Sequence, residues 1–349
     1  MTRERPWDGL PAATQNALAS AWRNYVPSEA SALHARWWQF ETWLRSLAYV
    51  ELRAKYGSKW LDEIPDKARR FAENEAKLAY MTSPDAELIL AYLDLADLFS
   101  LVDAKWELFK GSLIEKSAWM GRTQELRQIR HRIGHCRRPH TDDLARVEQM
   151  LRDLEKGTFR AVTSFNDCYW PKPDLADPIV DAWVREAHPT AQRLIKHAEN
   201  QYDTSFRLHF SRRPWANQYE KGTAVTGREG YFWHATFSVR GGADTVQFWK
   251  DWHIQGSRAQ DHIVFACFDG PSNVDLSFSA LDDPVVVADA IGECFDALLT
   301  ATRFSWAFDL RDSPDSWHQY SASLDPRVLT VGPWLVDKSM QPITLFSAG

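Results

Sequence analysis

Residues that can bind phosphate and move protons are concentrated in one short stretch, RQIRHRIGHCRRPH, at positions 127–140. Arginine stays charged at physiological pH and can hold two phosphate oxygens at once, whereas histidine exchanges a proton near pH 7. Four residues separate Arg130 from His135, and Gly134 directly precedes the histidine. The pattern favours a place where phosphate is held and a proton is transferred, although a solvated cationic helix end or a metal site would use the same residue types.

The elements that must position this stretch are predicted to be helices. Apolar residues recur at three- and four-residue intervals from Ala30 to Tyr56, which predicts an amphipathic helix with an aromatic face. Ser83 and Pro84 have the types of an N-cap and a first helical residue, and the apolar stripe continues to Phe99. The first 160 residues therefore indicate a helical bundle.

The arginine and histidine stretch is expected near the end of a further helix of this bundle. That helix should run from about Ser117 through the cluster, with Pro139 as its stop. Thr141 is expected to cap the next helix, which should continue to Gly157. The predicted buried face of this last helix consists of Val147, Met150, Leu151 and Leu154.

The second half of the chain has the pattern of an α+β domain. Prolines at 171, 173 and 178 mark a boundary, and a helix is expected over 177–201 with an interruption at Pro189. Alternation with a period of two then predicts strands at 206–210, 230–240, 245–255, 262–268 and 273–280. Turns at 241–242 and 269–270 favour antiparallel pairing, and an amphipathic helix follows Pro284.

The expected architecture is an α+β chain with two domains. We predict a helical bundle over residues 1–168, a proline-rich linker over 169–178, and a C-terminal domain over 179–349 with an antiparallel sheet and a packed helix.

The segment from Arg130 to His135 resembles the Arg-x4-His motif of the HEPN superfamily, and the resemblance covers roughly residues 30–160. HEPN domains are small helical bundles, and many are metal-independent ribonucleases. The chain departs from the commonest form of the motif in two places, with His131 where asparagine is frequent and Gly134 where alanine is frequent. The resemblance implies an N-terminal HEPN-like bundle and an endoribonuclease that serves as a toxin or antiviral-defence effector.

The resemblance also implies roles for the residues of the stretch. His135 would be the general acid and base, and Arg130 would stabilise the phosphate, so that RNA is cleaved by attack of the 2′-hydroxyl into a 2′,3′-cyclic phosphate and a 5′-hydroxyl. The surrounding arginines should disfavour the protonated form of His135. DNA lacks the attacking group and should be spared. The expected substrate-binding residues are His131, Arg127, Arg132, Arg137 and Arg138.

A partner protomer is expected on geometric grounds. On a straight helix Arg130 and His135 lie about 140° apart, so one helix does not direct both at one atom. In HEPN ribonucleases two protomers face each other and form one composite cleft, which implies a homodimer here, with Gly134 permitting close backbone approach. The C-terminal domain is then expected to recognise a trigger, an RNA or a regulatory partner.

Composition is consistent with a globular cytoplasmic protein. The formal net charge is −6, 44% of residues are hydrophobic and 25% are charged. The four cysteines include no CxxC pair, which argues against a disulfide framework or a zinc ribbon and favours a reducing compartment. The most apolar stretch is interrupted by Asp94 and Asp97, so we expect no membrane span, and we expect no cofactor or metal.

Three other interpretations compete with a ribonuclease. The stretch could be a solvated helix end, or the bundle could dimerise without catalysis and bind RNA or protein. A metal could use His131 and His135, at i and i+4, with Cys136 and His140, although five nearby arginines would oppose a divalent cation. The strand histidines at 234, 253 and 262 are expected to be sheet residues rather than ligands.

Overall fold

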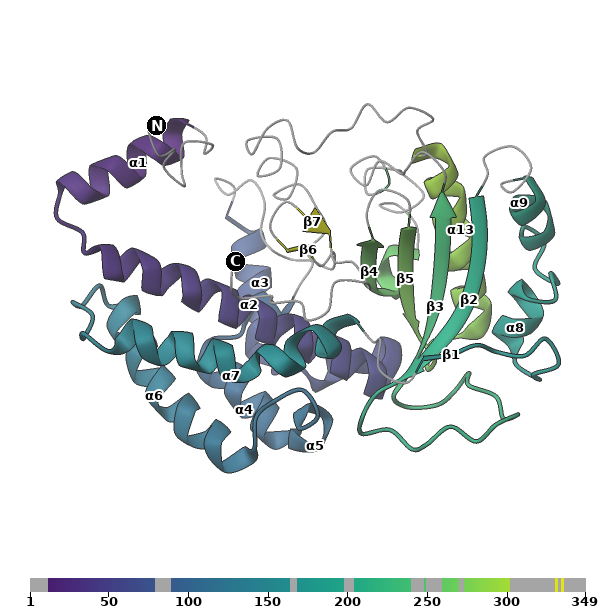
Figure 1. Cartoon of the computed structure of the whole chain (residues 1–349), viewed down its shortest axis with the longest axis horizontal. Helices are drawn as coiled ribbons and strands as arrows, with labels where there is room; N and C mark the ends of the chain where they lie inside the picture. Colours follow the sequence, from purple (N-terminus) through teal and green to yellow (C-terminus); the bar gives the residue numbers. More distant parts are fainter. Residues whose placement is uncertain are drawn as a thin grey trace. The chain divides into compact units, whose positions relative to one another are not determined.

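The chain contains a helical unit and a unit built around a sheet (Figure 1). The computed structural model describes residues 12–78, 89–163, 168–197, 204–239, 248, 259–269, 273–301, 330–331 and 334–335. One compact unit comprises Pro27–Val162, and the other comprises α1 (Ala12–Arg23) and the described residues from Thr163 onward. None of the helices in these ranges combines the length and apolar character needed to cross a lipid bilayer.

The helical unit confirms the main helices expected from the sequence. The prediction of a helix over Ala30–Tyr56 corresponds to α2, and that of a helix from Ser117 corresponds to α6. The described elements of this unit are α2 (Ser28–Tyr56), η1 (Gly57–Glu63), α3 (Asp66–Ala76), η2 (Ile89–Tyr92), α4 (Leu95–Ala104), α5 (Trp106–Phe109), α6 (Lys116–Gly134) and α7 (Asp143–Thr163).

An aromatic core fixes α6 against α2 and α4. The Phe40 ring of α2 lies 6.1 Å from the Phe99 ring of α4, and Phe99 meets Trp119 of α6 edge to face at 5.7 Å. All three side chains are almost fully buried. The Trp119 indole N–H donates to Asp103 Oδ1 at 3.0 Å, so the polar edge of the ring is also satisfied. This cluster holds in place the helix that carries the arginine and histidine stretch.

Two helix boundaries differ from the prediction. The expected start at Ser83 and Pro84 lies outside the described residues, and the apolar stripe that follows is divided between η2 and α4. Asp94 starts α4 anew because its carboxylate accepts the Asp97 amide at 2.9 Å, as an N-cap does. Helix α7 continues to Thr163 instead of ending at Gly157, since a glycine inside a helix costs only about 1 kcal/mol.

The C-terminal unit contains the expected antiparallel sheet, in the strand order β1-β2-β3-β5-β4. The strand predicted at 245–255 lies outside the described residues except for Phe248, which is buried and helical. The described elements are β1 (Cys168–Tyr169), α8 (Pro178–Trp183), α9 (Ala191–His197), β2 (Thr204–Arg212), β3 (Tyr231–Val239), α12 (Ala259–His262), β4 (Ile263–Asp269), β5 (Asn273–Ser279), α13 (Pro284–Ala301), β6 (Thr330–Val331) and β7 (Trp334–Leu335).

One face of the sheet is aromatic and is covered by α13 (Figure 1). Phe237 of β3 lies 5.0 Å from Phe295 of α13, and the Trp183 indole of α8 donates to the Ala288 carbonyl at 3.1 Å. The opposite face carries polar side chains that are also buried, including Asp275, Ser277 and Ser279 of β5. The alternation predicted for β5 is therefore confirmed, but both of its faces are covered.

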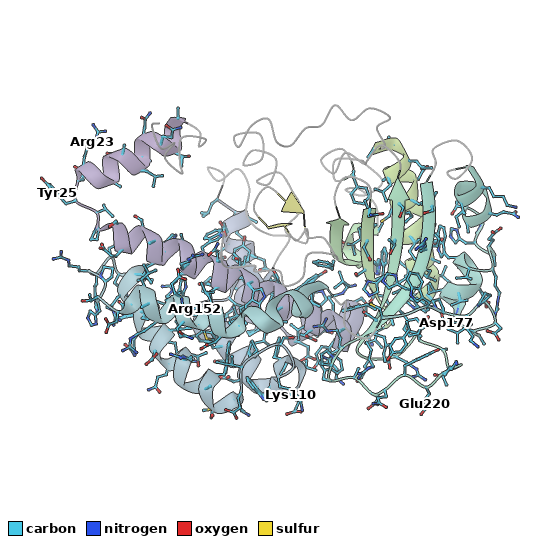
Figure 2. All side chains as sticks on the ribbon, viewed as in Figure 1. Arg23, Tyr25, Lys110, Arg152, Asp177 and Glu220 are labelled. Atoms are coloured by element: carbon cyan, nitrogen blue, oxygen red, sulfur yellow. The ribbon has the colours of Figure 1, made fainter. Side chains whose placement is uncertain are left out.

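Asp177, labelled in Figure 2, joins α8 to a distant loop. Its buried carboxylate accepts the Ile179 amide at 3.0 Å and the Val225 and Thr226 amides at 2.8 Å each. The Thr226 hydroxyl donates to the same group at 2.8 Å. One side chain thus satisfies donors from two segments that are about fifty residues apart in the chain.

We expect Asp177→Ala to lower the free energy of unfolding by about 3 kcal/mol, because it leaves several buried donors without an acceptor. Urea denaturation followed by circular dichroism measures the change. Asp181→Ala, in the same helix as Ile179, is the matched control. It removes an exposed ion pair with Arg185, which follows the helix, and should cost about 0.5 kcal/mol or less. Equal losses in the two variants would contradict the role assigned to Asp177.

Candidate active site at the end of helix α6

Helix α6 has one buried side and one exposed side that carries the candidate residues. Its start is capped by Glu115, whose carboxylate accepts the Ser117 amide at 2.9 Å. The buried residues recur at helical spacing and are Trp119, Thr123, Leu126 and Ile129. This packing turns the side chains of Arg127, Arg130 and His131 to the surface.

The helix ends in a Schellman turn, before the predicted stop at Pro139. The Arg137 amide donates to the Arg132 carbonyl at 2.9 Å, and the Cys136 amide donates to the Ile133 carbonyl at 3.0 Å. Cys136 has a φ of 51°, the left-handed conformation usually given to glycine at this position. His135 is the C-cap, with φ −101° and ψ 17°. The backbone therefore departs from helical geometry at His135, and the stop at Pro139 is corrected to Gly134.

Arg132 is anchored to the start of α7. Its Nε donates to Asp143 Oδ2 at 2.9 Å, its Nη2 donates to the other carboxylate oxygen, and the His140 amide also donates to Oδ2 at 2.9 Å. Burial alone would raise the pKa of Asp143, which is 2% exposed, but the Arg132 and His140 hydrogen bonds hold that pKa below its usual value of 3.8. This arrangement gives Arg132 a positioning role in the loop after α6.

Asp143→Asn is expected to destabilise the protein by about 2–3 kcal/mol at pH 7, because a charge-assisted bidentate contact is lost. The folded-state pKa of Asp143 is depressed, so its contribution is present above about pH 4 and is lost as the pH falls through the folded pKa. Urea denaturation should show that the difference in free energy of unfolding between variant and wild type is smaller at pH 3 than at pH 7. Asp142→Asn, at an exposed neighbour, is the control, and an equal effect there would refute the assignment.

The Arg130 side chain extends toward the C-terminal end of α6 and lies over Gly134, one turn further along the helix. A Cβ atom placed on Gly134 would overlap Arg130 Nη1 and would lie 3.5 Å from Cζ. Any larger residue at 134 would therefore have to displace the guanidinium. The glycine was expected to permit close approach of a second backbone, and the structure adds a role within one chain, since Gly134 leaves room for the Arg130 guanidinium.

The two histidines of the stretch are in direct contact. The rings of His131 and His135 have centroids 4.4 Å apart and are inclined at 68°. The charge of His135, with smaller effects from lost solvation, Arg137 and Arg130, lowers the pKa of His131. The lowered pKa favours the neutral form of His131, whose ring can both donate and accept hydrogen bonds.

The remaining arginines differ in their surroundings. The Arg127 guanidinium lies 5.4 Å from the centroid of the Phe99 ring, a cation–π contact that directs it along the surface. Within the part of the chain that the structure describes, Arg130, Arg137 and Arg138 form no ion pair with a carboxylate, and all three are exposed. The end of α6 thus presents cationic groups to solvent without internal counter-ions, as a site for phosphate requires.

The metal interpretation of the stretch gains no support from the geometry. Among the described residues, three ligating side chains converge at His209, His234 and Asp275 on the sheet, and no such group includes His131, His135, Cys136 or His140. Sequence reasoning did not identify that cluster on the sheet. It also missed the ion pair with Asp143, which no periodic pattern links to Arg132.

A family model gives the class of the segment that carries these features: the N-terminal part of the chain contains a HEPN domain. More particularly, residues 36–156 match the family model described as Swt1-like HEPN, which extends from α2 into α7 and includes the Arg130–His135 segment. No curated protein and no solved structure matches the chain.

Proposed function

We propose that this protein is a metal-independent endoribonuclease of HEPN type, with its active site at the end of α6. The observation that supports it most is the local arrangement of Arg130 and His135. Within the segment that matches the HEPN family model, the unpaired guanidinium lies over Gly134, and His135 follows directly as the C-cap. A phosphate-binding cation and a titratable imidazole are thereby both presented at one exposed helix end.

In the proposed reaction His135 removes the proton from the 2′-hydroxyl, and the 2′-oxygen attacks the adjacent phosphorus. Arg130 stabilises the charge that develops on the non-bridging oxygens. The bond from phosphorus to the 5′-oxygen breaks, and the imidazolium returns the proton to that leaving oxygen. The products are a 2′,3′-cyclic phosphate and a 5′-hydroxyl, and the reaction consumes no water or metal ion.

The other residues of the stretch would hold the RNA. Arg127, Arg137 and Arg138 are exposed cations suited to backbone phosphates, and neutral His131 can bind a base or a 2′-hydroxyl. Arg132 would act indirectly, by holding the loop to Asp143. We further propose that two protomers face each other to form one cleft, and that the C-terminal unit recognises a trigger, an RNA or a regulatory partner. A toxin or antiviral-defence effector would use such an enzyme in the cytoplasm.

The test compares three substrates of the same sequence in the presence of a chelator: RNA, RNA with a single 2′-deoxy position, and DNA. We expect cleavage of the RNA, no cut at the 2′-deoxy position of the modified RNA, and no cleavage of the DNA. Mass spectrometry should find a cyclic phosphate at each new 3′ end. Cleavage at the 2′-deoxy position would exclude the proposed chemistry. RNA binding without cleavage would favour the second candidate, a non-catalytic dimer that binds RNA or protein, which the exposed, unpaired arginines also suit.

A further inference from the structure

Three potential metal ligands from adjacent strands meet on the polar face of the sheet. His209 of β2 pairs with His234 of β3, and Asp275 of β5 pairs with Thr236 of β3. Because side chains alternate between the faces of a sheet, His234 and Thr236 share one face, and their cross-strand partners share it as well. The three ligands are therefore brought together by register alone, although they are up to 66 residues apart (275 − 209).

The distances within the cluster fit a single ion. The donor atoms of the three side chains all lie within 4.8 Å of one another. His234 Nδ1 is 3.5 Å from Asp275 Oδ1, and His209 Nε2 is 3.8 Å from Asp275 Oδ2. Ligand atoms on one tetrahedral zinc ion lie about 3.4 Å apart, given metal–ligand bonds of about 2.0–2.2 Å. The two histidine–carboxylate distances lie within about 0.4 Å of that spacing.

Hydroxyl groups surround the two imidazoles in the way that supports metal-bound histidines. The Ser211 hydroxyl lies 2.7 Å from His234 Nε2, on the side of the ring away from Asp275. The Thr236 hydroxyl lies 3.4 Å from His209 Nδ1 and donates to Asp275 Oδ2 at 3.2 Å. Such outer contacts fix the tautomer and orientation of a ligating ring. The two rings themselves are stacked, with centroids 4.6 Å apart.

A serine hydrolase site is the alternative that these residues suggest, and the geometry argues against it. Ser211 is fully buried near the end of β2, so its hydroxyl is not presented to a substrate. The Ser277 hydroxyl lies 2.8 Å from His234 Nδ1 and is closer than Asp275, so the ring is not oriented by the carboxylate alone. A group of two imidazoles and one carboxylate in a buried setting suits a divalent transition-metal ion better.

We propose that His209, His234 and Asp275 form a binding site for one divalent transition-metal ion, with zinc as the representative ion. The ligands are His209 Nε2, His234 Nδ1 and the Asp275 carboxylate, and the ion takes the place of the Ser277 contact at His234 Nδ1. The Ser211 and Thr236 hydroxyls hold the rings. The ion links β2, β3 and β5 and stabilises the C-terminal unit, since it binds the folded chain only. This inference is independent of the proposed ribonuclease, which requires no metal.

The experiment titrates metal-free full-length protein with Co²⁺ alone and with Zn²⁺ alone. We expect one equivalent of Co²⁺ to bind with visible ligand-field absorption, Zn²⁺ to displace it, and either ion to raise the melting temperature. His209→Gln and Asp275→Asn should weaken binding by more than about 100-fold and abolish the shift in melting temperature. His188→Gln is the matched control, because it breaks another His–Asp contact of the same unit, 2.8 Å from Asp289, and should bind like wild type.

The metal site remains testable even if the His209→Gln and Asp275→Asn variants do not fold. In that case Thr236→Val, which removes only the hydroxyl beside His209 and Asp275, should weaken binding about 10- to 100-fold. Failure of the wild-type protein to bind either ion, or equal binding by wild type, Asp275→Asn and Thr236→Val, would overturn the site. Loss of ribonuclease activity is not a readout here, so this test and that of the proposed function fail separately.

Discussion

Replacing His135 by glutamine is expected to reduce the rate of RNA cleavage by about 10²- to 10⁴-fold, the usual contribution of a positioned acid and base. Glutamine keeps the size and hydrogen bonding of the side chain but cannot exchange a proton. The free energy of unfolding should stay within about 0.5 kcal/mol of wild type, because the His135 side chain is exposed at the helix end. Cleavage of a labelled RNA and urea denaturation measure the two quantities.

His34→Gln is the matched control for this prediction. It changes an exposed histidine of α2 in the same helical unit, outside the stretch from Arg127 to Arg138, and should leave the cleavage rate unchanged. If His135→Gln cleaves RNA as fast as His34→Gln does, the acid and base lies elsewhere in the molecule.

The second large loss of cleavage rate is expected when Arg130 is removed or displaced. Two substitutions test it, one at Arg130 and one at Gly134. Arg130→Ala should lower the cleavage rate about 10²- to 10³-fold, because the developing phosphoryl charge loses its cation. Gly134→Ala should lower the cleavage rate about 100-fold, because the new methyl group displaces the Arg130 guanidinium. The same change should stabilise α6 by up to about 1 kcal/mol. Cleavage kinetics and thermal unfolding of the same samples check both. A Gly134→Ala enzyme with undiminished activity would contradict the position assigned to Arg130.

Mixing two inactive variants tests whether the site is shared between protomers. A dimer of Arg130→Ala with His135→Gln contains one intact arginine and one intact histidine on opposite chains. If the two residues act across an interface, the mixture regains part of the wild-type rate, and neither variant alone does. An inactive mixture, with heterodimers verified by native mass spectrometry, would require both residues from one chain.

The sequence predicted the helices of the N-terminal unit because their signal is local. The buried stripe of α2 and the exposed cationic side of α6 follow from spacing alone. The turn at Cys136 was not predictable, since the left-handed conformation there is stabilised by backbone hydrogen bonds and not by a glycine. The pairing of Arg132 with Asp143 depends on how two helices pack, which a one-dimensional pattern does not contain.

In the C-terminal unit, strands were predictable and their burial was not. Alternation in β5 predicted which residues share a face. It did not predict that both faces are covered, nor that β2 and β3 align His209 with His234. Strand register is set by contacts between distant segments, so convergent side chains on a sheet are found only in three dimensions.

Arg132 stabilises the turn after α6 with both its backbone and its side chain. Its carbonyl accepts the Arg137 amide, and its guanidinium holds Asp143, so one residue closes the short loop that begins at His135. A loop closed in this way has little conformational entropy left to lose when a ligand arrives. The backbone at His135 is consequently ordered before any ligand arrives. In the proposed complex with RNA, more of the binding free energy of the phosphate contacts would therefore be retained as affinity.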